Sequence, residues 1–230
     1  MRIQNIKTIS RGLMKKQLIL CVVVALTLVL SQSMLAQDNP INLGARLGLN
    51  LGDVSFDPDL PSEVTSSMRT GFAFGAYGEI GVAENFFITG EFLYLQSGTV
   101  LKEGSEEITF KADYLSIPIS AKYKFAIENS TVKPFVFGGP TIGFNAKAEY
   151  VSGSSTEDVG KNTESINFGI HFGAGVEFEV TPGTNLFFDA GYGLGLSNGY
   201  KHTDDSIFDS NQKIYSRDIG IKAGVSFKIN

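Results

Sequence analysis

The pair His171 and Asp189 is the first candidate for chemistry in this chain. Together with a serine, a histidine held by an aspartate could activate a hydroxyl group for hydrolysis. A triad is defined by geometry, however, and no local motif marks a nucleophilic serine in this sequence. We therefore expect an interior histidine that is hydrogen-bonded to a carboxylate, and no catalytic residue.

Two further motifs could bind a small ligand. His202 lies close to Asp204 and Asp205, a combination that could make a weak metal contact; a solvated, charged loop tip is the favoured interpretation. The glycine-rich segment 191–195 reads G-Y-G-L-G, but no helix follows it and its glycines fall on every second position, as on one face of a strand. The sequence thus predicts neither a cofactor nor a metal site.

A larger set of ionisable side chains shares one property, which is that each lies opposite the apolar face of a predicted strand. If the strands close into a narrow barrel, these side chains point into it and must pair or keep water, because an unpaired buried charge is costly. We expect a structural network of ion pairs that plugs the lumen; a narrow water-filled conduit is the alternative. The predicted set is Arg46, Glu79, Glu91, Lys122, Lys124, His171, Glu177, Glu179, Asp189, Asp218, Lys222 and Lys228.

The strands that must position this network are visible as alternating patterns. Residues 165–180 read S-I-N-F-G-I-H-F-G-A-G-V-E-F-E-V, with every even position apolar and every odd position polar or glycine. Such a segment is a ribbon with one apolar face, and it is long enough to cross a bilayer as a tilted strand of about 9–11 residues. Eight segments are predicted as strands, and only the faces of 132–147 cannot be assigned: 41–51, 70–82, 86–96, 112–125, 132–147, 165–180, 185–197 and 214–229.

The connections between these segments alternate in length. Residues 53–69, 98–111, 148–164 and 198–213 are long, polar and mostly acidic, whereas 83–85, 127–131 and 181–184 are short. An even number of strands with alternating long and short connections is typical of bacterial outer-membrane barrels, which have long extracellular loops and periplasmic termini. A soluble barrel would have no reason to alternate its loop lengths. We therefore predict an all-β, eight-stranded antiparallel up-and-down transmembrane barrel in the outer membrane.

The first 36 residues have the features of a secretory signal peptide. Five basic residues precede an apolar run at 18–30, and Ala36 ends the segment before Gln37. We expect cleavage after Ala36 and a barrel domain over 37–230. Cys21, the single cysteine of the chain, lies inside this leader, so the mature chain should contain no disulfide and no cysteine-ligated metal.

Charge limits the possible partners. Without the leader the chain keeps 14 basic and 24 acidic side chains, a formal charge of −10, so nucleic acid is not an expected partner. The expected partners are outer-membrane lipid, the barrel-assembly machinery during insertion, and a possible protein bound at the extracellular loops.

Two segments carry a family resemblance. Residues 113–125 read D-Y-L-S-I-P-I-S-A-K-Y-K-F and 135–144 read F-V-F-G-G-P-T-I-G-F. Both resemble motifs of the PorT-like outer-membrane β-barrel proteins of Bacteroidota, and the general architecture is similar to that of OmpA and OmpX barrels. The resemblance also accounts for Pro118 within a strand, where we expect a bulge.

From these observations we expect a non-enzymatic structural or interaction component, porin-like in architecture but with a plugged lumen. Two alternatives remain open at this point. One is a barrel enzyme that modifies outer-leaflet lipid through His171 or His202. The other is a component of a secretion or gliding apparatus, as some PorT-like proteins are.

Overall fold

The computed structural model describes residues 39–203 and 211–229. The predicted signal peptide, its cleavage site and Cys21 lie outside the described residues, as do Asp204 and Asp205. Within the described part, no helix is both long enough and apolar enough to cross a membrane.

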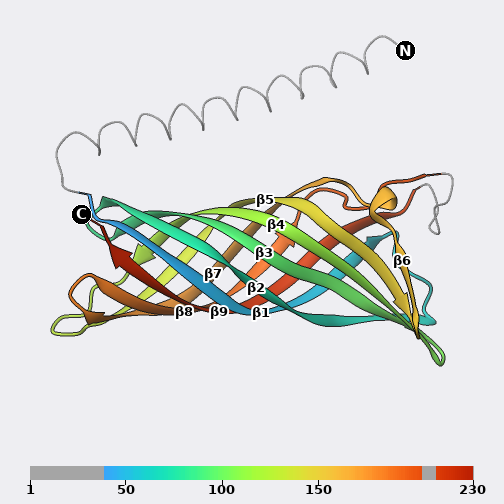
Figure 1. The fold of residues 1–230 in the computed structure, drawn as a ribbon, viewed down its shortest axis with the longest axis horizontal. Helices are drawn as coiled ribbons and strands as arrows, with labels where there is room; N and C mark the ends of the chain where they lie inside the picture. Colours follow the sequence, from blue (N-terminus) through green and yellow to red (C-terminus); the bar gives the residue numbers. More distant parts are fainter. Residues whose placement is uncertain (1–38, 204–210, 230) are drawn as a thin grey trace, which may run out of the picture. The chain divides into compact units, whose positions relative to one another are not determined.

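The described chain forms one antiparallel sheet that closes into a ring (Figure 1). Eight strands make the ring in the order β1-β2-β3-β4-β5-β7-β8-β9, and β9 pairs with β1 to close it. The elements are β1 (Ile41–Asp57), β2 (Val64–Ala83), β3 (Phe86–Glu103), β4 (Glu106–Lys124), β5 (Val132–Ser152), β6 (Ser155–Asp158), the 3₁₀ helix η1 (Gly160–Asn162), β7 (Ile166–Thr181), β8 (Thr184–Gly195) and β9 (Lys213–Lys228). Closure leaves no unpaired sheet edge around the ring, and the prediction of an eight-stranded all-β barrel is confirmed.

The strands extend further than the sequence pattern predicts, and mostly at one end of the barrel. We call this the loop end, and the end with the connections 84–85, 125–131 and 182–183 the turn end. At the loop end β3 and β4 meet at a two-residue turn, and β5 continues into a hairpin with β6. Much of the predicted loops 53–69, 98–111 and 148–164 is therefore strand. Antiparallel pairing satisfies backbone groups whatever the side chains are, so it does not have to stop where the apolar pattern stops.

The apolar face of the barrel points outward. Leu47 of β1 is 67% exposed, Phe72 of β2 is 61% exposed and Phe172 of β7 is 51% exposed. In contrast, Phe187 on the inward face of β8 is 1% exposed. Exposed large apolar side chains occur on all eight strands of the ring, which is the arrangement expected for a wall that meets lipid.

One local prediction about β4 is wrong. The register between β4 and β5 is the same on both sides of Pro118, so there is no bulge at the proline. The irregularity in this pair lies at Asp113 and Tyr114 instead. Residues 119 and 120 lie outside the paired positions, opposite Gly139 and Pro140. The two prolines thus interrupt the ladder without shifting it, because a missing N–H removes a bond but adds no residue.

Candidate functional site

The interior of the barrel is the candidate site, because the polar faces of all eight strands meet there. Near the turn end, four charged side chains form a closed ring of ion pairs. Lys122 Nζ lies 2.9 Å from Glu79 Oε2 and 3.2 Å from Glu177 Oε2. Lys124 Nζ lies 2.6 Å from Glu79 Oε1 and 2.7 Å from Glu177 Oε1. We call these four residues the ion-pair ring; each is at most 5% exposed.

Neighbouring polar groups complete the hydrogen bonding of the ion-pair ring. Asn42 Nδ2 donates to Glu79 Oε1 at 2.9 Å, and Tyr77 Oη donates to Glu79 Oε2 at 2.7 Å. Every carboxylate oxygen in the ring therefore has a donor, as a buried carboxylate requires. The contributing residues come from β1, β2, β4 and β7, so the ring ties distant strands together across the lumen.

A layer of aromatic side chains lies beside the ion-pair ring. Tyr77, Phe135 and Phe187 form one buried cluster against which Phe137 packs. Their rings occupy space left by glycines: Phe187 Cζ lies 2.2 Å from where a Cβ at Gly224 would be. Sequence reasoning missed the three phenylalanines as interior residues. The only available signal was the odd position of Phe187 in its strand, which it shares with Asp189.

Arg46 forms ion pairs with two carboxylates in the interior of the barrel. Its Nη1 lies 2.6 Å from Glu91 Oε1, and its Nη2 pairs with Asp189 Oδ2. Arg46, Glu91 and Asp189 are each no more than 8% exposed. Three atoms of this group lack a hydrogen-bond partner among the described residues, namely Arg46 Nε, Glu91 Oε2 and Asp189 Oδ1.

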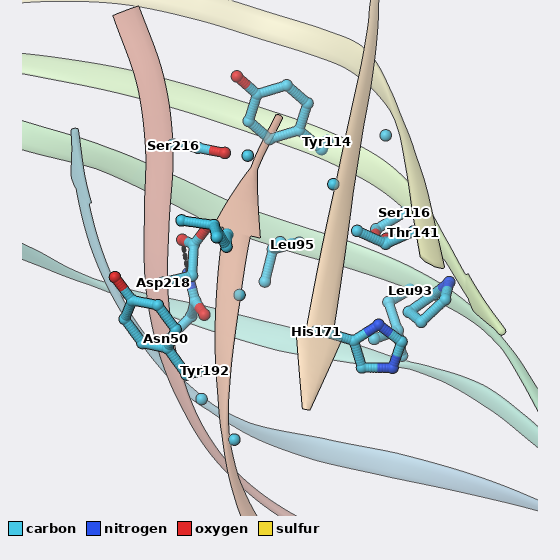
Figure 2. Close-up of a pocket in the computed structure, with 18 of the residues that line it drawn as sticks. Asn50, Leu93, Leu95, Tyr114, Ser116, Thr141, His171, Tyr192, Ser216 and Asp218 are labelled. Carbon is cyan, nitrogen blue, oxygen red and sulfur yellow. Dashed lines mark hydrogen bonds between the residues drawn. The ribbon is translucent and has the colours of Figure 1, made fainter. Parts of the chain in front are cut away.

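A cavity of about 110 Å³ occupies the half of the interior nearer the loop end. Figure 2 shows residues that line it. Asp218 lies on its wall, where Oδ1 accepts from Asn50 Nδ2 at 2.8 Å and from Ser97 Oγ at 2.5 Å. Lys222 also lines the cavity. The buried members of the predicted set therefore divide into three groups along the barrel, a division that alternation along the strands does not predict.

Two predicted members of the network are not part of it. Glu179 and Lys228 are exposed at the turn end, where both line a separate cavity of about 270 Å³. Glu179 Oε1 accepts from the backbone N–H of Gly183 at 3.2 Å. Alternation along a strand gives the face of a residue but not its depth, so it cannot separate an exposed mouth from a buried interior.

Among the described residues, no carboxylate is hydrogen-bonded to His171, contrary to the expectation from the sequence. His171 Nε2 lies 2.6 Å from Ser120 Oγ, and Nδ1 has no hydrogen-bond partner among the described residues. Asp189 pairs with Arg46 instead, since it is opposite Gly175 on β7, four residues from His171. Ser120 is only 2% exposed. A buried serine and a histidine without a carboxylate do not make the relay of a triad.

The second histidine, His202, contacts a backbone carbonyl group and an aromatic ring. His202 Nε2 is 3.1 Å from the carbonyl oxygen of Gln212, and its ring packs edge-on against Tyr200. Among residues 39–203 and 211–229, no group of three or more His, Cys, Asp or Glu side chains is placed to hold a metal ion. The glycines of 191–195 lie on strand β8, as the alternation predicts.

Solved structures with a similar arrangement include Neisserial surface protein A, at 19% identity over 84% of this chain and 100% of that chain, with a TM-score of 0.48. Ail of Yersinia pestis is 17% identical over 81% of this chain and 98% of its own chain, with a TM-score of 0.40. OprG of Pseudomonas aeruginosa has 12% identity over 82% and 95%, with a TM-score of 0.45.

No sequence match to a curated protein was found. A family model described as "Outer membrane protein beta-barrel domain" matches residues 31–201. This range covers seven of the eight strands of the ring and most of the interior residues described above. The chain belongs to the family of outer membrane protein beta-barrel domains.

Proposed function

We propose that this protein is a non-enzymatic outer-membrane barrel whose lumen is closed to ion flow, and that it acts as a structural or interaction component. The observation that carries this proposal is the ion-pair ring. Two lysines and two glutamates bridge the lumen, and each lysine contacts both carboxylates. Their charges cancel, so they hold one another in place with no need for a mobile counter-ion.

The aromatic layer supports the same conclusion. An ion crossing the lumen would have to pass both the ion-pair ring and the cluster of Tyr77, Phe135 and Phe187. Opening the ring leaves buried charges unpaired, which costs several kcal/mol when one partner is lost. An eight-stranded barrel is only wide enough for its own side chains to fill.

The test of closure is conductance. Purified protein in planar bilayers should give no steady single-channel current, because the ring and the aromatic layer fill the lumen. Stable, large unitary currents from pure protein would overturn the proposal and favour a conduit. A conductive barrel from the same preparation method serves as the positive control.

For the orientation, we propose that the loop end faces the cell exterior and that both termini are periplasmic. The polar hairpins at the loop end support this, because outer-membrane barrels carry their longer connections outside. The acidic side chains of these hairpins are the proposed contact surface for a protein partner. Outer-membrane lipid would cover the outward apolar side chains, and the barrel-assembly machinery would insert the protein into the membrane.

An enzymatic role is the weaker proposal. Ser120 is buried, and His171 has no carboxylate on its other nitrogen, so neither group is set up for nucleophilic catalysis. Lipid A from cells with and without the protein should therefore be identical by mass spectrometry. A change in the mass of lipid A that depends on the protein would support the enzymatic role.

We further propose that the chain is of the PorT-like type found in Bacteroidota. The two motif segments support this because they lie side by side, with Pro118 paired to Thr141 and Ile117 to Ile142 on β4 and β5. Some PorT-like proteins serve secretion or gliding machines. Loss of secretion or gliding upon deletion, restored by the wild-type gene, would identify that role.

A further inference from the structure

The cavity near the loop end has walls that suit an aromatic ring (Figure 2). Leu93 and Leu95 of β3 and Tyr114 of β4 line it, and the glycines of β7 and β8 complete the wall. Its volume is about 110 Å³. An apolar cavity of about 150 Å³ can take up benzene, so this smaller one has space for one ring at most.

The rest of the interior shows what glycines in this barrel are packed against. Nearer the turn end, inward glycines of β7 lie against phenylalanine rings of β5: Phe135 Cζ lies 2.5 Å from the Cβ position of Gly175, and Phe137 Cζ lies 2.6 Å from that of Gly173. At Gly193 the nearest atoms belong to Asp218, at 3.5 Å or more. The cavity thus lies where the next ring in the series would be.

The charges around the cavity indicate which charged group a ligand would carry in addition to its ring. Glu91 and Asp218 line it with negative charge and Lys222 with positive charge. With the ion-pair partners Arg46 and Asp189 included, the group has two positive and three negative charges when His171 is neutral. One further positive charge would balance it.

Glu91 and Asp218 each present a carboxylate oxygen as a candidate acceptor for such a ligand. Glu91 is 8% exposed, and its Oε2 has no hydrogen-bond partner among the described residues. Asp218 already accepts two hydrogen bonds through Oδ1, while its Oδ2 lies 3.9 Å from the Cβ position of Gly193 and so faces the glycine wall. An ammonium group needs acceptors of this kind.

A second, smaller cavity lies between this one and the loop end. This second cavity, of about 40 Å³, shares Tyr114, Asn167 and Ser216 with the first and is lined further out by Tyr150 and Tyr200. The acidic mature chain raises the local concentration of cations at its surface. A small cation entering from the loop end would therefore pass Tyr114 before it reaches Asp218.

We propose that this cavity binds a small monocyclic aromatic amine, with its ring against Leu93, Leu95 and the glycine wall and its ammonium group toward Asp218 and Glu91. This inference goes beyond the proposed function. It does not depend on the lumen being closed, because the cavity could bind the ligand whether or not ions can cross the barrel.

The test measures binding to the full protein in nanodiscs of zwitterionic lipid by ligand-observed NMR. The probes are 2-phenylethylamine and phenylacetate, which share the ring and differ in charge, and empty nanodiscs correct for partition into lipid. We expect saturable binding of 2-phenylethylamine, with phenylacetate at least tenfold weaker. No saturable binding above empty discs, or phenylacetate as tight as the amine, would overturn the proposal, and these comparisons require no variant.

Two matched substitutions locate the site. Gly193→Leu fills the cavity from a position where a Cβ meets nothing closer than 3.5 Å. Gly90→Leu makes the same change on the outer face of β3, where a Cβ meets nothing within 4 Å. We expect at least a tenfold loss of amine affinity for Gly193→Leu and no change for Gly90→Leu. Retained affinity in folded Gly193→Leu, judged by heat-modifiable gel migration, would place the ligand elsewhere and refute this site.

Charge is tested at Asp218. Asp218→Asn keeps the shape of the side chain and removes its charge, so the affinity for 2-phenylethylamine should fall at least tenfold while that for neutral benzyl alcohol stays the same. An equal loss for both probes would show that Asp218 acts only on the shape of the cavity, which contradicts the proposed ammonium contact.

Discussion

Lys122 packs its ammonium group against the ring of Phe135, with Nζ 3.9 Å from the ring centroid. The same nitrogen contacts Glu79 and Glu177. A cation over an aromatic face gains about 2 kcal/mol or more when both are removed from water. Lys122 therefore joins the ion-pair ring to the aromatic layer, and the two layers should respond together when either is altered.

Removing one carboxylate of the ion-pair ring should destabilise the barrel. Glu177→Gln keeps the shape of the side chain but leaves Lys122 and Lys124 with one carboxylate each. We expect a loss of about 3–5 kcal/mol in the free energy of unfolding, as is usual when a buried pair loses one partner. Reversible urea unfolding in lipid vesicles measures it.

Glu179→Gln is the matched control for this change. Glu179 lies two residues further along the same strand and is exposed, so its substitution should stay within about 0.5 kcal/mol of wild type. Equal effects of the two substitutions would mean that the buried ring contributes nothing specific to stability.

On the outward face of the barrel, adding a charge should lower the free energy of unfolding more than shortening a side chain does. Phe172 is 51% exposed, so Phe172→Arg puts a charge into the membrane at a cost of about 2–4 kcal/mol. Phe172→Ser adds no charge and should be milder. The same unfolding assay in vesicles compares the two.

Phe187 provides the inward counterpart on β8. It is 1% exposed, and Phe187→Ser should cost about 3–5 kcal/mol because it leaves a cavity in the aromatic layer. If Phe172→Ser were as damaging as Phe172→Arg, then the outer face would be packed against protein and not against lipid.

Gly224 should not tolerate a side chain. A Cβ there would lie 2.2 Å from Phe187 Cζ and 2.8 Å from the carbonyl oxygen of Ala45, so Gly224→Ala should cost about 1–3 kcal/mol through overpacking. Gly90→Ala, where no atom lies within 4 Å, should leave the urea midpoint unchanged. A neutral result at Gly224 would show that Phe187 can move aside and that the aromatic layer is loosely packed.

The proposed orientation can be read by labelling with a membrane-impermeant thiol reagent on intact cells. Ser154→Cys lies in the turn between β5 and β6 at the loop end and should react. Glu128→Cys lies in the turn before β5 and should react only after the outer membrane is opened. Gly183, in another short turn, is unsuitable because its φ of 79° favours glycine. The reverse labelling pattern would refute the orientation.

The sequence by itself determined the strands and most of their faces. Alternation is a local property: each residue points opposite to its neighbour whatever its partners are. For this reason Phe172 and Leu47 could be placed outside and Glu177 and Arg46 inside from the sequence alone. The even number of strands and the alternating connections then indicated a closed barrel. The pattern was uninformative at 132–147, where Phe135 and Val136 are both apolar and the structure buries only Phe135.

Only the tertiary structure decided which charges meet. Arg46 and Asp189 are 143 residues apart, and their contact depends on closure, which places β9 between β1 and β8 and sets its register with both strands. A shift of one strand would change the depth of its side chains, and no local pattern records depth. For the same reason the sequence could not show that Asp189 pairs with Arg46 and not with His171, that Glu179 and Lys228 stay exposed, or that a cavity remains beside Asp218. Side-chain direction follows from the chain itself, whereas partners in a barrel are set by closure.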